Sequence, residues 1–481
     1  MQPRVIQRVL GYLLVMFSLT MVPPLVVELI YRDGVALPFI IAFAVIACTG
    51  GVLWYTARDQ RATLRLRDSF IVVVVFWGAL GIAGSLPFLL YQPLELSVAA
   101  AIFESMSGLT TTGATLIVGL DSLPHSILFY RQQMQWLGGM GIIVLAVAIL
   151  PALGIGGMQL FRAESSGPTK NKLTPRIAET AKALWYIYMG LTVACAVAYY
   201  FAGMDAFDAI GHSFSTVAIG GFSTHDASIG YYHSRTIEMI AVVFMLISGV
   251  NFALHFMTFR SRRLQHYVLN AEFMGYLTIL GVLTFIAGCY LALTQTASVS
   301  DAFFDGLFHA VSIGTTTGFT TQEYFLWPGF LPVLLLFASF AGGCAGSTGG
   351  GMKVIRILLL FKQGQRELRR MLHPNAVFLV KLGGTPVNDR TNDNVWGFFA
   401  TYIAIMVVMM LLLMAAGLDQ ESAFSAVVAC LNNLGPGLGE VGSNYSSLGD
   451  FSLSVLSLAM LFGRLEIFTL LILFTPAFWA R

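Results

Sequence analysis

The stretch Thr111-Thr112-Gly113 returns three more times along the chain in related form, as Ile219-Gly220-Gly221, Thr316-Thr317-Gly318 and Asn433-Leu434-Gly435. Each copy follows a segment too short to cross a bilayer, and each lies between two long apolar segments. Aligning the four copies on their last glycine brings Ser107, Ser215, Ser312 and Ala429 into one column, six residues upstream. The chain therefore carries four copies of one unit, in which a short glycine loop separates two apolar segments.

The composition predicts a polytopic membrane protein. With 57% hydrophobic and 11% charged residues and a mean hydropathy of +0.76 over 481 residues, the chain is far more apolar than soluble globular proteins. Since a helix needs about 20 apolar residues to span a bilayer, ten spans are expected. They are 8–30, 36–56, 68–92, 127–153, 177–203, 234–258, 271–296, 328–362, 393–417 and 451–478.

The fold expected from this pattern is all-α, with four pseudo-symmetric repeats of helix, pore loop and helix after an extra N-terminal pair of helices. The pair occupies 1–60, and the repeats occupy 61–160, 161–262, 263–370, with a broken second helix, and 371–481. The five cysteines fall singly in or beside apolar segments, which predicts neither a disulfide framework nor a metal site.

The distribution of basic residues predicts the orientation, because Lys and Arg concentrate in cytoplasmic loops. They cluster at 58–67, 162–182, 260–263 and 362–381, whereas the opposite side carries only Arg32, Arg131 and Arg235. Both termini are therefore expected in the cytoplasm, with all four glycine loops entering from outside. The basic inner loops suit anionic lipids, and the acids of the outer face either attract cations or merely cap short helices.

The four loops have the features of a cation selectivity filter. Non-helical backbone exists at membrane depth only where protein buries it or where it lines a watery cavity, so four such loops are expected to converge on one axis. The preceding stretches, 98–109, 206–216, 301–313 and 420–431, would then act as re-entrant half-helices whose negative ends favour a cation. The filter is expected to comprise Thr111, Thr112, Gly113, Ile219, Gly220, Gly221, Thr316, Thr317, Gly318, Asn433, Leu434 and Gly435. An isolated glycine would more often mark close helix packing, but the fourfold placement favours the filter.

The eighth expected span contains a break. Glycine-rich sequence at 342–351 separates its two apolar halves, and each glycine costs about 1 kcal/mol of helix stability relative to alanine. A broken helix at mid-membrane is typical of ligand pathways, so we expect a flexible gate beneath the filter. Arg464 lies about 20 Å into the last expected span and either donates to buried carbonyls or forms a barrier to cations. The expected gate residues are Gly343, Gly346, Ser347, Thr348, Gly349, Gly350, Gly351 and Arg464.

Together with the four loops, the runs LGGMG at 137–141, AGGCAGSTGGGMK at 341–353, NNLGPGLG at 432–439 and FGRLE at 462–466 carry a family resemblance. The chain resembles the TrkH family, the membrane subunits of bacterial Trk potassium uptake systems within the superfamily of K+ transporters. The resemblance covers the whole chain. It implies a homodimer in the bacterial inner membrane, with one K+ pathway per subunit and a separate cytoplasmic TrkA-like nucleotide-binding ring, and it favours the barrier role of Arg464.

The expected K+ positions are not equivalent around the ring. They are Thr111, Thr112, Ile219, Gly220, Thr316, Thr317, Asn433 and Leu434. No loop contains the Thr-Val-Gly-Tyr-Gly sequence of potassium channels, and loops two and four replace threonines with Ile219, Asn433 and Leu434. Fewer equivalent oxygens predict weaker discrimination between K+ and its neighbours Rb+ and Na+.

Three functions remain open at this stage, none of them enzymatic. They are a gated channel-like K+ uptake pathway, a K+ symporter coupled to H+ or Na+, and a transporter of organic solutes, against which four repeats of one orientation argue. Two glycine runs, 346–353 and 435–439, only partly match nucleotide-binding fingerprints, because the required Ser or Thr and the preceding strand are lacking. Hence we expect no cofactor on this chain, with nucleotide only on the regulatory partner, and no nucleic acid partner.

Overall fold

The computed structural model describes residues 2–59, 66–139, 141 and 177–480, and within them the chain is predominantly helical. The strands of this part are β1 (Lys381–Leu382) and β2 (Thr385–Pro386), which form one antiparallel hairpin. The expected all-α class is confirmed. The expected basic residues at 162–176, and the second half of the expected span 127–153, lie outside the described residues.

Six helical segments of the described chain are long and apolar enough to cross a membrane. They are Pro3–Tyr31 (α1 Pro3–Ser18, η1 Leu19–Met21 and α2 Val22–Tyr31), α3 (Ala36–Thr56), Arg67–Leu90 (α4 Leu66–Gly84 and α5 Leu86–Leu90), Lys182–Phe201 (in α10, Ile177–Phe201), α15 (Ala271–Leu293) and α19 (Asp389–Ala415). The count rises to eight if each of two bent helix pairs is one span. Ten spans therefore remain a prediction.

Two expected spans are not continuous helices. Residues 234–258 divide into α12 (Arg235–Ser248) and α13 (Phe252–Ser261), at an angle of 89°. Residues 451–478 divide into α21 (Asp450–Arg464), α22 (Phe468–Leu471) and η7 (Ile472–Phe474), with a bend of 108°. The expected spans crossed both bends because long apolar stretches flank the few polar residues there, which are Asn251 at the first and Arg464 and Glu466 at the second.

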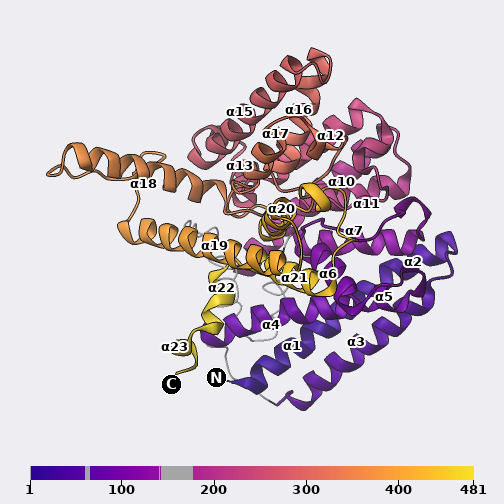
Figure 1. Cartoon of the computed structure of the whole chain (residues 1–481). Helices are drawn as coiled ribbons and strands as arrows, with labels where there is room; N and C mark the ends of the chain where they lie inside the picture. The colour runs from indigo at the N-terminus through magenta and orange to yellow at the C-terminus, as the bar shows by residue number, and fades with distance from the viewer. Residues whose placement is uncertain (1, 60–65, 140, 142–176, 481) are drawn as a thin grey trace.

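The expected break in the eighth span is present. Its first helix, α17 (Leu331–Ala338), ends well before the glycine-rich segment, which we define as residues 342–351. Its second, α18 (Val354–Leu372), begins three residues after that segment. In Figure 1, α18 projects away from the rest of the molecule, and α19 runs beside it and back towards α21.

Each glycine loop follows a short helix, and all four helices begin in the same way. They are α6 (Val98–Leu109), α11 (Ala206–Ala218), α16 (Val299–Gly314) and α20 (Gln420–Leu431). Ser97, Asp205, Ser298 and Asp419 precede them, and each of these side chains accepts a hydrogen bond from the backbone N–H three residues on. The capped ends lie opposite the glycine loops.

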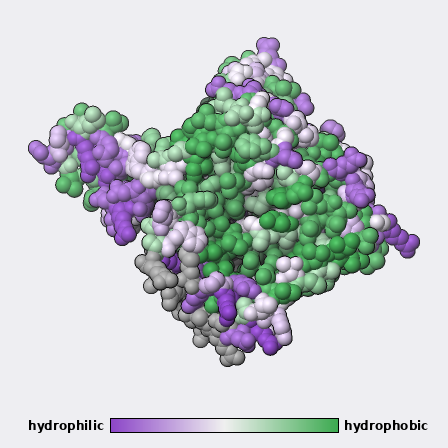
Figure 2. Space-filling model, turned by 60° about the horizontal axis from the view of Figure 1, so that its bottom comes forward, coloured by the Kyte–Doolittle hydropathy of each residue, from purple (hydrophilic) through white to green (hydrophobic). Residues whose placement is uncertain are grey.

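A space-filling view shows where the apolar surface lies. Hydrophobic residues cover a broad continuous face in Figure 2, and hydrophilic residues gather at the projecting ends. Exposed side chains such as Leu29, Phe201, Phe285 and Leu293 belong to the long apolar helices. An apolar surface of this extent suits lipid rather than water.

Candidate functional site

The four glycine loops share one backbone conformation. Their first residues, Thr111, Ile219, Thr316 and Asn433, have positive φ values of 55°, 55°, 70° and 53°, and their last glycines have values of 81°, 81°, 83° and 99°. The middle residue of each loop donates its N–H to the carbonyl five residues back, at 2.7 to 2.9 Å. A positive φ is a genuine outlier for a β-branched residue, and such backbone strain clusters at functional sites. The sequence column through Ser107, Ser215, Ser312 and Ala429 is therefore also a structural column.

The loops meet in a closed ring, which we call the glycine-loop ring (residues 111–113, 219–221, 316–318 and 433–435). A side chain at Gly113 would overlap the carbonyl oxygen of Gly220 in the second loop. The same relation holds from Gly221 to Thr317, from Gly318 to Leu434, and from Gly435 back to Thr112. Since each glycine packs directly on the backbone of the next loop, four segments far apart in sequence surround one axis.

A cavity of about 310 Å³ opens on one side of the ring. All four last glycines line it, and so do the carboxylate-bearing residues Asp226 and Glu323. Asp226 is also held in place, because its carboxylate accepts hydrogen bonds from the N–H groups of Gly119 and Leu120 at 3.1 and 3.0 Å. We call this cavity the acidic vestibule; its place on the outer side of the membrane stays a prediction.

A second cavity, of about 190 Å³, lies on the other side of the ring. The glycine-rich segment contributes residues 346–351 to its wall, and Asn433 of the fourth loop faces the same space. Lys353, Arg464 and Glu466 complete a charged lining. The ring thus separates two cavities, one that contains Arg131 and His225 beside its two acids, and one that contains two basic side chains and one acid.

The glycine-rich segment is hydrogen-bonded directly to the ring and to the short helices. Gly350 donates its N–H to the Thr316 hydroxyl at 2.7 Å, and Gly351 donates to the Asn432 carbonyl at 2.9 Å. The Thr348 hydroxyl donates to the Val217 carbonyl at 3.1 Å. Because these partners come from the second, third and fourth repeats, the segment lies across the base of the ring.

Arg464 connects the segment to the first repeat. Its guanidinium donates to the Thr111 hydroxyl at 3.3 Å and to the Thr348 carbonyl at 3.4 Å, and it also bonds the Gly138 carbonyl. The last expected span is not a continuous helix here, because α21 ends at Arg464 and the chain then turns through positive φ at Glu466 and Ile467. Because Arg464 is the last residue of α21, its side chain can reach the base of the glycine-loop ring.

Sequence reasoning missed a buried polar network behind the first two loops. Arg131, expected among the few basic residues of the outer side, is fully buried and pairs with the equally buried Glu104 at 2.9 Å. Gln135, four residues further along the chain, donates to the Gly220 carbonyl at 2.6 Å. Comparison of the repeat columns would have shown Glu104, because it lies nine residues before Gly113, as His212 does before Gly221.

Comparisons with known proteins agree on one family. The chain matches the family model TrkH, described as cation transport protein, over residues 37–296 and 277–481. It is 59% identical over 485 residues to the Trk system potassium uptake protein TrkH of Vibrio parahaemolyticus, covering 100% of both chains. It is 56% identical over 480 residues to the protein of that name from Escherichia coli, covering 99% of both. The crystal structure of the potassium transporter TrkH from Vibrio parahaemolyticus superposes with a TM-score of 0.91 at 57% identity, covering 100% of both chains.

Proposed function

The chain belongs to the TrkH family of cation transport proteins, integral membrane proteins of Trk potassium uptake systems and not enzymes, and from that premise we propose that its glycine-loop ring is a selectivity filter. The pathway is gated and channel-like, and K+ is the transported ion. The observation that carries the proposal is the closure of the ring, in which each last glycine packs on the carbonyl-bearing backbone of the next loop. Such a ring can replace the hydration shell of an ion with backbone oxygens.

Cation preference follows from charge and dipoles. The C-terminal ends of α6, α11, α16 and α20 lead into the ring, and a helix C-terminus carries roughly half a negative charge. The acidic vestibule with Asp226 and Glu323 raises the local concentration of cations. The proposed K+ positions are those named from the sequence, at the first and middle residues of each loop.

The unequal loops are proposed to weaken selectivity. Asn433 uses its amide N–H to bond the Thr112 hydroxyl at 3.0 Å and the Met460 carbonyl at 3.0 Å, and Ile219 offers no hydroxyl. Two of the four loops therefore lack the threonine oxygen that Thr111 and Thr316 supply. A Na+ permeability in liposomes as low as that of tetrameric potassium channels would contradict this.

The glycine-rich segment and Arg464 are proposed to form the gate. Both lie under the ring and bond hydroxyls of its first residues, Thr111 and Thr316. A cation leaving the ring would meet a guanidinium and a loop that fills the base of the pathway. Movement of this segment would open the path without disturbing the ring.

The assembly is also proposed from the family resemblance. Two copies of the chain form a homodimer in the bacterial inner membrane with both termini in the cytoplasm, where a TrkA-like nucleotide-binding ring controls the gate. Basic residues at 260–263 and on α18, such as Arg369 and Arg370, lie on the side proposed to face this regulator and anionic lipids. The projection of α18 in Figure 1 gives a route from such a partner to the glycine-rich segment.

The gate is tested by releasing it. Arg464→Ala, and separately deletion of 343–350, should raise K+ flux in proteoliposomes. Loss of hydrogen bonds from a charged group removes about 1.5–3 kcal/mol from the closed state, which corresponds to roughly a tenfold or larger shift towards the open one. Arg235→Ala, which removes an arginine paired with Asp301 and Asp305 on another face, is the matched control and should leave flux unchanged. Unchanged flux in both variants would contradict the proposal that Arg464 and the glycine-rich segment form the gate.

The alternative is symport with H+ or Na+. A reversal potential measured across bilayers with opposed K+ and pH gradients distinguishes the two. Nernstian dependence on K+ alone favours the channel-like pathway, whereas a shift with pH or with Na+ favours coupling. We favour the first, because the charged side chain that contacts the ring is an arginine, which does not release its proton near neutral pH.

A further inference from the structure

The residue nine positions before each last glycine lies behind its loop. These residues are Glu104, His212, His309 and Ala426, and the residues two positions after the same glycines are Thr115, Ser223, Thr320 and Gly437. In the first two repeats the two positions are hydrogen-bonded. Glu104 accepts from the Thr115 hydroxyl at 2.9 Å, and the His212 ring bonds the Ser223 hydroxyl at 2.9 Å. In these two repeats, the short helix before the loop is thus hydrogen-bonded to the residue two positions after the loop.

The first repeat strengthens this contact with an ion pair. Glu104 and Arg131 are both fully buried, and the Glu104 carboxylate also accepts from the Leu116 N–H at 3.1 Å. Arg131 donates to the Thr115 hydroxyl at 2.9 Å. The oxygens and N–H groups of this pair thus form further hydrogen bonds. A buried ion pair is tolerated when its polar atoms are satisfied in this way.

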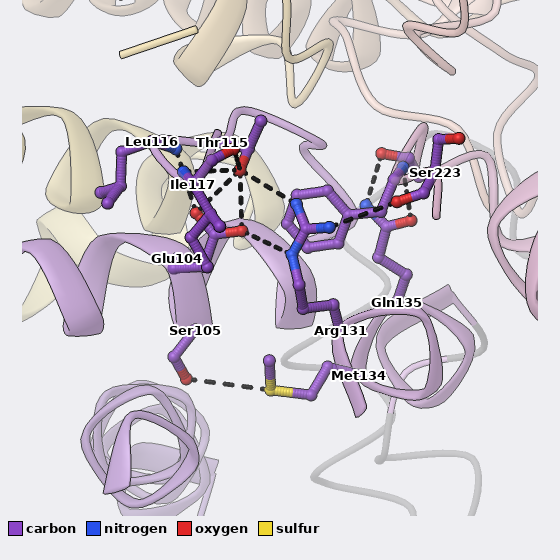
Figure 3. A network of polar contacts seen from close by, with 11 residues as sticks. Glu104, Ser105, Thr115, Leu116, Ile117, Arg131, Met134, Gln135 and Ser223 are labelled. Atoms are coloured by element: carbon purple, nitrogen blue, oxygen red, sulfur yellow. Dashed lines mark hydrogen bonds and ion pairs between the residues drawn. The ribbon is translucent and has the colours of Figure 1, made fainter. Parts of the chain in front are cut away.

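Arg131 and Gln135 then reach the second loop. Both belong to α7 (His125–Gly139) and stand four residues apart, on one face of the helix. The Arg131 guanidinium donates to the Ser223 carbonyl at 3.2 Å and lies 4.3 Å from the centre of the Phe222 ring. Figure 3 shows Arg131 between Glu104 on one side and Ser223 on the other. One helix of the first repeat therefore contacts the chain after both loops.

Gln135 holds the second loop by its backbone. Its amide donates to the Gly220 carbonyl at 2.6 Å and accepts from the Phe222 N–H at 3.0 Å. The Gly220 carbonyl is also the atom on which Gly113 packs. Gln135 therefore fixes the oxygen at the junction of loops one and two.

This support is specific to the first repeat. The positions that correspond to Arg131, eighteen residues after the last glycine, are Met239, Leu336 and Leu453. Through Arg131 and Gln135, the first repeat supports the second loop, which has Ile219 in place of threonine. Its middle residue, Gly220, has no side chain, whereas Thr112 and Thr317 bond the hydroxyls of Thr110 and Thr315 at 2.7 and 2.8 Å.

We propose that Glu104, Arg131 and Gln135 are positioning residues that set the discrimination between K+ and Na+ at the junction of loops one and two. The proposal rests on the proposed filter and names the part of it that determines selectivity. Arg131 also lines the acidic vestibule, but none of the three belongs to the glycine-loop ring itself. They act through Gly220 and through the chain after Gly113 and Gly221.

The test is the K+/Na+ permeability ratio, obtained from reversal potentials of purified protein in bilayers, because this ratio does not depend on how many molecules are folded. Arg131→Lys keeps the charge beside Glu104 but removes the planar fork that bridges the loops, and it should lower the ratio at least fivefold. Gln135→Met, of similar length, should lower the ratio about threefold without disturbing the ion pair.

A double variant separates positioning from folding. Glu104→Gln with Arg131→Met removes both charges together, so no buried charge is left without a partner. It should reach the membrane in amounts closer to wild type than Glu104→Gln alone, and still show the reduced ratio. Arg235→Gln, which breaks an ion pair elsewhere on the molecule, should keep the wild-type ratio.

The outcomes are distinct. Wild-type ratios in Arg131→Lys, in Gln135→Met or in the double variant would overturn the positioning role while leaving the filter intact. A wild-type protein whose reversal potential ignores the K+ gradient would instead overturn the filter itself.

Discussion

Glycine serves opposite purposes in the glycine-loop ring and in the glycine-rich segment beneath it. In the ring, Gly113, Gly221, Gly318 and Gly435 all have positive φ and pack on the backbone of the next loop, so each is fixed by its neighbour. In the segment, the run at 349–351 interrupts a helix that apolar sequence would otherwise continue. The same residue type therefore forms a tightly packed ring in one place and interrupts a helix, at the proposed gate, in the other.

The contacts that hold the glycine-loop ring also differ in kind from those that hold the glycine-rich segment. Neighbouring loops contact each other through backbone, which has little freedom to rearrange. The glycine-rich segment is held partly by long side chains, since Lys353 bonds the Gly349 carbonyl and Arg464 bonds the Thr348 carbonyl. Long charged side chains can change rotamer without refolding the chain around them.

The largest effect is expected from Gly221→Ala. The new methyl would overlap the Thr317 carbonyl, and φ there is 81°, which alanine rarely adopts, so the substitution strains the ring whatever space is made. K+ uptake, measured as growth of a potassium-uptake-deficient bacterium in low K+, should be abolished.

The control is Gly190→Ala. This glycine lies in α10, and no atom approaches the position of an added methyl within 4 Å. Growth should match wild type, with a small gain in helix stability of about 0.5–1 kcal/mol. Growth of Gly221→Ala at the wild-type rate would show that the four loops do not form a tight ring.

The second prediction applies the same substitution to the glycine-rich segment and expects the opposite sign. At Gly350 an added methyl would overlap the Asn432 carbonyl, but φ there is not positive. The segment can therefore move away from the ring instead of distorting it. Gly350→Ala should raise K+ flux in proteoliposomes about fivefold, as expected for the loss of roughly 1 kcal/mol from the closed state. A fall in flux would mean that the segment is part of the path and not its barrier.

The glycine-loop ring and the glycine-rich segment could both be located from sequence, because each has a local sequence pattern. The ring follows from a glycine that returns in four copies, and the hydrogen bonds from Thr112 to Ser107 and from Thr317 to Ser312 repeat the same spacing. The glycine-rich segment follows from helix propensity alone. Neither inference depends on contacts between residues that are distant in the sequence.

What sequence could not provide depends on contacts between distant residues. Glu104 and Arg131 are 27 positions apart, and charge counting assigned the arginine to the outer surface because nothing local identifies its partner. The bend after Arg464 passes through positive φ at Glu466 and Ile467, which are not glycine and so carry no signal of it. Tertiary packing decides both.

The smallest effect is expected outside the ring, at His225 in the acidic vestibule. Its ring bonds Asp121 at 2.5 Å and Asp208 at 2.9 Å and stacks on Tyr231 at 3.5 Å. Burial alone would lower the pKa of His225, but hydrogen bonds and attraction from Asp208 and Asp121 outweigh burial and raise that pKa above its ordinary value. Protonated His225 thus stabilises the folded vestibule.

The sign of the pH dependence follows from the raised pKa. The stabilisation is complete below the ordinary histidine pKa of about 6.5 and is lost as pH rises through the higher pKa of the folded state. Asp121→Asn should bring the pKa of His225 closer to 6.5, as measured by NMR of the imidazole. It should also reduce the pH dependence of the thermal midpoint by the equivalent of less than about 1 kcal/mol, since Asp121 is half exposed and its attraction is screened. The K+/Na+ permeability ratio should not change, because His225 lies outside the backbone contacts that fix the ring. A changed ratio in Asp121→Asn would show that the rigid region extends into the vestibule.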